Sequence, residues 1–103
     1  MKILVADDHP LVRSGLRITL TDMEEGIVVI EAKDFDETYK AVEENFDLDL
    51  VLLDLTMPGA TGMSGLQKLR EDFPAVPIAV LSGAEEAHFV RSAMDLGAAG
   101  FIP

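Results

Sequence analysis

The sequence contains no cysteine and few basic residues, and both shortages limit what the protein can be. Without cysteine there is neither a disulfide framework nor a thiolate metal site, which favours a cytoplasmic protein. The 8 basic residues stand against 19 acidic ones, so the formal net charge is −11. Because a field of this sign repels nucleic-acid phosphates, we expect this chain to bind no nucleic acid.

Long hydrophobic runs are also missing, although 49% of the residues are hydrophobic. No apolar run approaches the roughly 20 residues of a membrane-spanning helix. The first residues show no signal-peptide pattern. We therefore expect a cytoplasmic protein that does not bind membranes. At 103 residues, the chain is long enough for one domain with a single hydrophobic core.

What the sequence does contain is a regular alternation of short apolar runs and amphipathic stretches. Continuously apolar runs are typical of strands that are buried on both faces of a parallel sheet. The runs predict strands at residues 2–7, 27–30, 50–53, 77–81 and 99–102. Since helical patterns separate these strands, the sequence predicts βαβ units and a parallel sheet with right-handed crossovers.

Capping residues and apolar spacing locate the helices between these strands. Pro10 suits the first turn of a helix, where its missing N–H would be unpaired in any case. Asp34 with Glu37 three residues later resembles a capping box. The residues predicted to face inward are Val12, Leu16 and Leu20, then Thr38, Ala41, Val42 and Phe46, then Leu66, Leu69 and Phe73, and finally Ala87, Val90 and Met94 on a helix over 85–96.

Acidic or hydroxyl side chains stand where three of the apolar runs end. Asp7 and Asp8 follow the first run, Asp54 follows the third, and Ser82 follows the fourth. Because ligands bind beyond the carboxyl ends of the strands in an open α/β sheet, we predict that these side chains share one basin. Adjacent carboxylates repel one another, and Mg²⁺, which prefers oxygen ligands, removes that cost. A carboxylate such as Asp54 can also act as a nucleophile towards phosphorus.

Each of these residues also has a simpler interpretation. Asp7 and Asp8 could instead be solvated loop acids that favour the start of the next helix. Ser82 taken alone is better explained as a cap or turn residue ahead of Gly83. His9 fits a loop role better than a role as a metal ligand, because Mg²⁺ is a hard cation.

Four segments, taken together and in order, resemble the receiver domain of two-component response regulators. They are residues 5–8 (Val-Ala-Asp-Asp), 52–59 with Gly62 beyond, 80–83, and 97–103. The resemblance spans residues 1–103 and implies a flavodoxin-like, doubly wound parallel sheet of five strands in the order 2-1-3-4-5. The family places a lysine and a closing helix after the Phe-Ile-Pro segment. The sequence stops at Pro103, so we interpret the chain as a C-terminally truncated receiver whose last helix is missing.

The resemblance also implies roles for individual residues. Asp54 would accept a phosphoryl group from a sensor histidine kinase. Ser82 would be the switch hydroxyl that moves towards this group, and Phe101 the aromatic switch that turns inward with it. The implied ligands of Mg²⁺ are Asp7, Asp8, Asp54 and the backbone carbonyl of Thr56.

The loop at 57–59 and the ending at 101–103 are similar to receivers that precede a LuxR-type helix-turn-helix domain, as in the NarL and FixJ subgroup. This implies transcription regulation through a DNA-binding output domain of the full-length protein, and it is compatible with a homodimer. A haloacid-dehalogenase-like phosphatase would need Asp-x-Asp after the first strand, and the acids here are adjacent. We therefore expect no enzyme. A phosphorylation-independent interaction or dimerisation module stays open as the alternative.

Overall fold

Strands that are apolar along their whole length form the centre of the molecule. The computed structural model describes residues 1–55, 57, 59, 63–81 and 100–102. Its strands are β1 (Lys2–Ala6), β2 (Val28–Ala32), β3 (Leu50–Asp54), β4 (Ile78–Leu81) and β5 (Gly100–Ile102). They pair in parallel in the order β2-β1-β3-β4-β5. The predicted doubly wound parallel sheet and its strand order are therefore confirmed.

The strand ends differ from the predicted ones because pairing, and not hydropathy, sets them. β2 runs on to Ala32, since its last two residues pair with Val5 and Ala6 of β1. β3 includes Asp54, which pairs with Leu81 of β4. β1 ends one residue earlier than predicted, and β2, β4 and β5 each begin one residue later. The last residues of β2 and β3 are therefore assigned from their pairing with neighbouring strands, and hydropathy alone does not predict them.

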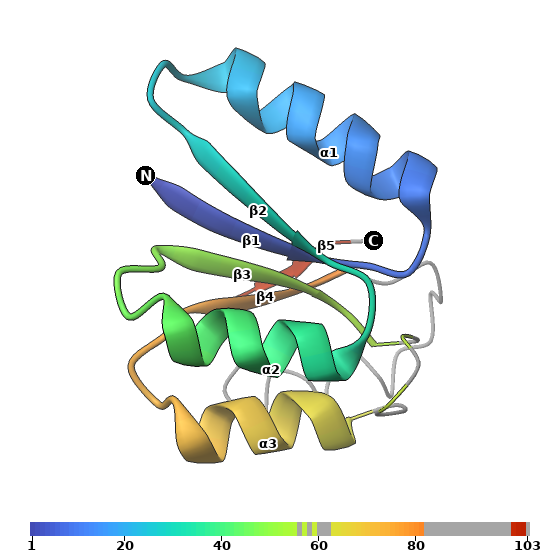
Figure 1. Ribbon diagram of the computed structural model, residues 1–103, viewed down its shortest axis with the longest axis vertical. Helices are drawn as coiled ribbons and strands as arrows, with labels where there is room; N and C mark the ends of the chain where they lie inside the picture. Colours follow the sequence, from blue (N-terminus) through green and yellow to red (C-terminus); the bar gives the residue numbers. More distant parts are fainter. Residues whose placement is uncertain (56, 58, 60–62, 82–99, 103) are drawn as a thin grey trace.

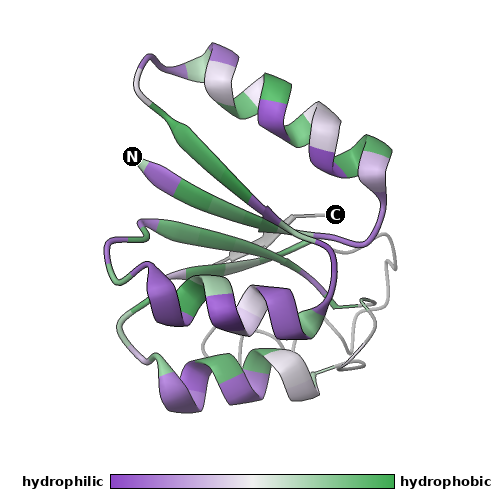
Figure 2. Cartoon of the chain, viewed as in Figure 1, coloured by the Kyte–Doolittle hydropathy of each residue, from purple (hydrophilic) through white to green (hydrophobic). Residues whose placement is uncertain are grey.

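Helices cover both faces of the sheet (Figure 1). α1 (Pro10–Met23) lies on one face, and α2 (Phe35–Glu44) and α3 (Ser64–Asp72) lie on the other. Figure 2 shows apolar residues along the strands and mixed polarity on the helices. The buried side chains accordingly form two clusters, one on each face of the sheet. No helix in the described ranges is long and apolar enough to span a membrane.

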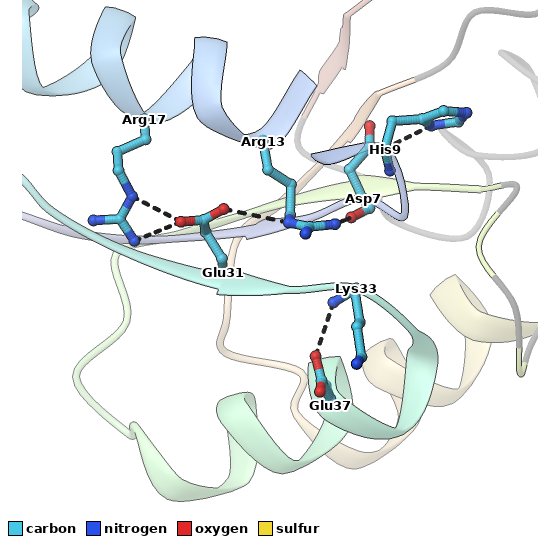
Figure 3. Close-up of polar contacts among 7 residues, drawn as sticks. All are labelled: Asp7, His9, Arg13, Arg17, Glu31, Lys33 and Glu37. Carbon is cyan, nitrogen blue, oxygen red and sulfur yellow. Dashed lines mark hydrogen bonds and ion pairs between the residues drawn. The ribbon is translucent and has the colours of Figure 1, made fainter. Parts of the chain in front are cut away.

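The predicted capping box begins α2. The Glu37 N–H donates to the Asp34 carboxylate at 2.8 Å. The Glu37 carboxylate accepts from the Lys33 N–H at 3.0 Å, one residue before the cap (Figure 3). The Thr38 hydroxyl donates to the Asp34 carbonyl at 2.7 Å, which allows this polar side chain to be fully buried. The bond from the Glu37 N–H satisfies a donor that the first helical turn leaves unpaired, and the bond from the Lys33 N–H ties the chain before the cap to the helix.

Most of the predicted inward-facing residues are confirmed. Thr38, Val42, Leu66 and Leu69 are buried, and Leu16, Leu20, Ala41 and Phe73 are partly buried against the core clusters. Between α2 and α3, the Tyr39 ring packs against the Phe73 ring, and its hydroxyl donates to Asp72 at 2.6 Å. The predicted helix over 85–96, with Ala87, Val90 and Met94, lies outside the described residues.

Phe46 was predicted to be inward-facing, and this is wrong, because the residue is 94% exposed. α2 ends at Glu44, and the N–H of the capping residue Asn45 donates to the Val42 carbonyl. Phe46 therefore lies beyond the helix, where helical spacing no longer determines which side it faces. Leu48, two residues later, is buried instead.

Val12 was also predicted to face inward, and this is wrong, because the residue is 44% exposed. The inward position in the first turn of α1 is occupied by Arg13, whose side chain is only 16% exposed. Arg13, Leu16 and Leu20 follow the i, i+3, i+7 spacing of one helix face. Arg13 is thus the first residue of the inward-facing stripe of α1. Its guanidinium can be partly buried there because it donates hydrogen bonds to Glu31 and to the Asp7 carbonyl.

Candidate functional site

The ends of β1 and β3 bring the predicted acidic residues together. β1 and β3 are parallel neighbours in which Ala6 pairs with Leu53. Asp7 follows β1, and Asp54 is the last residue of β3, so both stand at the same edge of the sheet. Ligand atoms of Asp7, Asp8, Asp54 and His9 all lie within 4.8 Å of one another. This confirms the predicted convergence of carboxylates from distant parts of the chain.

The two strand-end carboxylates are buried, and the third is partly open. Asp7 is 5% exposed and Asp54 is 7% exposed, whereas the Asp8 side chain is 31% exposed. An ionised carboxylate is costly to bury without compensating charges or hydrogen bonds. The site therefore gathers like charges in a place where water screens them poorly, and it requires a cationic partner.

The His9 imidazole lies beside the carboxylates and becomes such a partner when it is protonated. Its Nδ1 lies 2.8 Å from Asp7 Oδ1, 3.0 Å from Asp8 Oδ1 and 3.9 Å from Asp54 Oδ2. The hydrogen bond to Asp7 and the negative charge of Asp8 raise the pKa of His9 above its ordinary value. From the sequence we expected a loop role for His9 and did not expect its ring to join the cluster. Its position directly after two acids was the only available signal.

One carboxylate oxygen of the site lacks a hydrogen bond. Asp8 Oδ1 is buried and accepts none from any described residue. Although His9 Nδ1 is 3.0 Å away, that nitrogen carries at most one hydrogen, and Asp7 Oδ1 is the closer acceptor at 2.8 Å. An unsatisfied, buried, anionic oxygen beside two further carboxylates suits a hard divalent cation with oxygen ligands. The residues present therefore fit Mg²⁺.

The remaining predicted site residues are placed less completely. Thr56 and Ser82 lie outside the described residues. Phe101 lies in β5, where its backbone pairs with Val80 of β4. The site that the structure describes thus consists of the three acids and His9.

Two arginines of α1 meet a glutamate of β2 beside this site (Figure 3), and the sequence analysis missed them. Arg13 Nε donates to Glu31 at 3.3 Å, and Arg17 Nε donates to the other oxygen of Glu31 at 2.7 Å. Arg13 Nη1 also donates to the Asp7 backbone carbonyl at 2.6 Å. The alignment of Arg13 with Leu16 and Leu20 on one helix face was the signal that could have revealed its inward position.

Comparison with known proteins agrees with this geometry. The family model of the response regulator receiver domain matches residues 3–103. The chain belongs to this family. Receiver domains of two-component response regulators generally bind Mg²⁺ at an acidic cluster, and this receiver has one at the ends of β1 and β3.

Relatives of this receiver are transcription regulators. The glycerol metabolism activator of Pseudomonas putida is 43% identical over 101 residues, which cover 98% of this chain and 46% of that protein. The crystal structure of a LuxR-family response regulator from Aurantimonas is 34% identical, has a TM-score of 0.85, and is matched over 97% of this chain and 71% of that one.

A third match is the isolated receiver domain of RcsB from Salmonella enterica, determined with the phosphomimetic BeF₃⁻. It is 28% identical with a TM-score of 0.83, over 99% of this chain and 75% of that chain. The receiver spans about half the length of the curated relatives it matches. Response regulators partner with histidine kinases, and RcsB from Salmonella enterica, which is 27% identical to this chain, has been determined bound to a promoter.

Proposed function

We propose that this receiver accepts a phosphoryl group from a sensor histidine kinase onto Asp54. The observation that carries the proposal is the convergence of the carboxylates of Asp7, Asp8 and Asp54 within 4.8 Å. We assign the nucleophile to Asp54 because it ends a central strand, is nearly buried, and lies within 4.8 Å of the other two acids at the switch point of the sheet.

The transfer is a displacement at phosphorus. A carboxylate oxygen of Asp54 attacks the phosphorus of the phosphohistidine, a new P–O bond forms, and the P–N bond breaks. The kinase imidazole leaves with the bonding electron pair and takes up a proton. The product on this chain is an acyl phosphate at Asp54. In the sequence, Thr56 stands two residues after Asp54, where an aspartyl-phosphate phosphatase would carry a second carboxylate, and Asp7 and Asp8 are adjacent. We therefore propose a phospho-accepting switch and not an enzyme of multiple turnover.

Asp7, Asp8, Asp54 and the backbone carbonyl of Thr56 would hold Mg²⁺. When bound, the cation neutralises the charge that spreads over the phosphoryl oxygens. The cation would also give a partner to the buried Asp8 Oδ1, which accepts no hydrogen bond from the described residues. The His9 ring also lies beside these acids, and the hydrogen bond to Asp7 and the charge of Asp8 raise its pKa.

Ser82 and Phe101 would convert phosphorylation into a change of surface. Ser82 follows β4, the strand next to β3, and Phe101 lies in β5 beyond it. The Ser82 hydroxyl would move towards the phosphoryl group, and the Phe101 ring would turn inward. In the full-length cytoplasmic protein, this population shift would control a DNA-binding output domain and thereby transcription.

The test treats the full-length protein with a small acyl phosphate donor and Mg²⁺, and reads the product by intact-mass spectrometry. We expect one phosphoryl group on the wild type and none on Asp54→Asn. The control is Asp22→Asn, an exposed acid in the last turn of α1, which should be modified like the wild type. If the wild type gains nothing, the phosphorylation-independent interaction module becomes the better hypothesis. Modification of Asp54→Asn would place the acceptor elsewhere.

A further inference from the structure

A guanidinium on α1 holds the backbone that carries the acidic pair. Arg13 Nη1 donates to the Asp7 carbonyl at 2.6 Å, from a side chain that is 16% exposed (Figure 3). The carbonyl of Asp7 belongs to the peptide unit that continues into Asp8. Because a peptide unit is planar, fixing this oxygen also fixes the direction in which Asp8 leaves the strand.

The other bonds of Asp7 complete this restraint. Its N–H donates to the Ala32 carbonyl of β2 at 3.0 Å. Its side-chain Oδ1 accepts from the His9 N–H at 2.8 Å. The backbone N–H and carbonyl of Asp7 are thus tied to different elements, and Arg13 supplies the tie to α1. The loop that presents two acids to the site is clamped between β2 and α1.

Glu31 makes Arg13 a rigid tie. Its carboxylate lies on β2, accepts from Arg13 through one oxygen, and is held through the other by Arg17 at 2.7 Å. Arg17 is 46% exposed, and within the described part of the chain no contact joins it to the loop at Asp7–His9. Both arginines therefore bind Glu31. Of the two, only Arg13 also donates a hydrogen bond to the backbone carbonyl of Asp7.

We propose that Arg13, held by Glu31, is a positioning residue for the Mg²⁺ site. This inference rests on the proposed function of the acidic cluster. Without the tie, the mutual repulsion of the carboxylates opens the loop, and the cation must then reassemble the site as it binds. Arg13 also carries a positive charge that by itself opposes a nearby cation. Loss of positioning weakens binding and loss of charge tightens it, so the sign of the change separates the two.

The experiment measures the Mg²⁺ dissociation constant of the full-length protein by isothermal titration calorimetry. We expect Arg13→Gln to weaken Mg²⁺ binding by about tenfold, the lower end of the effect of residues that orient metal ligands. Arg17→Gln is the matched control, since it removes the same charge from the same helix and the same glutamate. Its affinity should stay within about twofold of wild type, because the tie to Asp7 is intact. Arg13→Lys can still reach the carbonyl with one donor, so we expect it to restore part of the affinity.

A second readout needs no metal. Amide hydrogen exchange in the metal-free protein should become faster at Asp7 and His9 in Arg13→Gln, and not in Arg17→Gln. Wild-type protein that binds no Mg²⁺ would overturn the proposed function and this inference with it. If the wild type binds Mg²⁺ and Arg13→Gln binds it equally tightly or more tightly, the positioning role of Arg13 is overturned and the proposed function stands.

Discussion

Neutralising Asp8 should stabilise the metal-free protein, although the residue belongs to the proposed site. Asp8→Asn keeps the shape of the side chain and removes one negative charge. In the wild type that charge lies within 4.8 Å of ligand atoms of Asp7 and Asp54, both nearly buried. Asp8 Oδ1 is itself buried and accepts no hydrogen bond from the described residues. The substitution therefore removes two repulsions and gives up one attraction, to His9 at 3.0 Å.

The geometry sets the size of the effect. Two unit charges at this separation interact with about 3.5 kcal/mol at an effective dielectric constant near 20. A protonated His9 ring at 3.0 Å would attract Asp8 by about 5.5 kcal/mol on the same basis, so the two repulsions exceed that attraction by about 1.5 kcal/mol. Because the Asp8 side chain is 31% exposed, water screens this remainder, and we expect a gain of about 1 kcal/mol in the free energy of unfolding. In urea this corresponds to a midpoint that is higher by about 1 M for a protein of this size.

The assay is urea unfolding followed by far-UV circular dichroism, with EDTA and then with Mg²⁺. Wild type should gain stability with Mg²⁺, by about 2.7 kcal/mol at a concentration one hundred times the dissociation constant. Asp8→Asn should gain much less, so that its advantage disappears. Glu25→Gln, in the exposed turn after α1, controls for the change in net charge. If Asp8→Asn is no more stable than the wild type in EDTA, the carboxylates of Asp7, Asp8 and Asp54 do not repel one another strongly, and the case for a metal site that relieves this repulsion fails.

Three further substitutions test the packing and the charges of the fold. Leu66→Ala empties a fully buried position and should cost about 2–5 kcal/mol, and a urea-derived loss below about 1 kcal/mol would contradict tight packing of α3. Gly15→Ala adds a Cβ that meets nothing within 4 Å in α1. Because alanine favours the helix over glycine, the free energy of unfolding, measured by thermal unfolding, should rise by about 0.5–1 kcal/mol. A lower melting temperature would argue against a regular helix there. Hydrogen bonds from Tyr39 and Lys68 lower the pKa of Asp72 below 3.8, so its contribution is full above that pH and is lost as the pH falls through the folded-state pKa. Tyr39→Phe should therefore destabilise the protein at neutral pH and progressively less in acid, and a loss independent of pH would count against the Tyr39–Asp72 bond.

The sequence alone was enough for the architecture and the centre of the site. Apolar runs, the Asp34 cap and Pro10 are local signals, and local signals determine which segments become strands and helices. Parallel strands present their carboxyl ends at one edge, so Asp7 and Asp54 could be brought together before any distance was known. The match of residues 3–103 to the receiver family agrees with that interpretation.

Only the tertiary structure decided which side chains support the site. Arg13 contacts the Asp7 carbonyl and Glu31, 18 residues further along the chain, and hydropathy spacing treats such a residue as a solvated charge. His9 joins the carboxylates because the turn after β1 directs its ring back over them. Phe46 is exposed because α2 ends before it. In each case the position of the side chain depends on a tertiary contact or on where a helix ends. The residue's own preference for burial or exposure does not determine it.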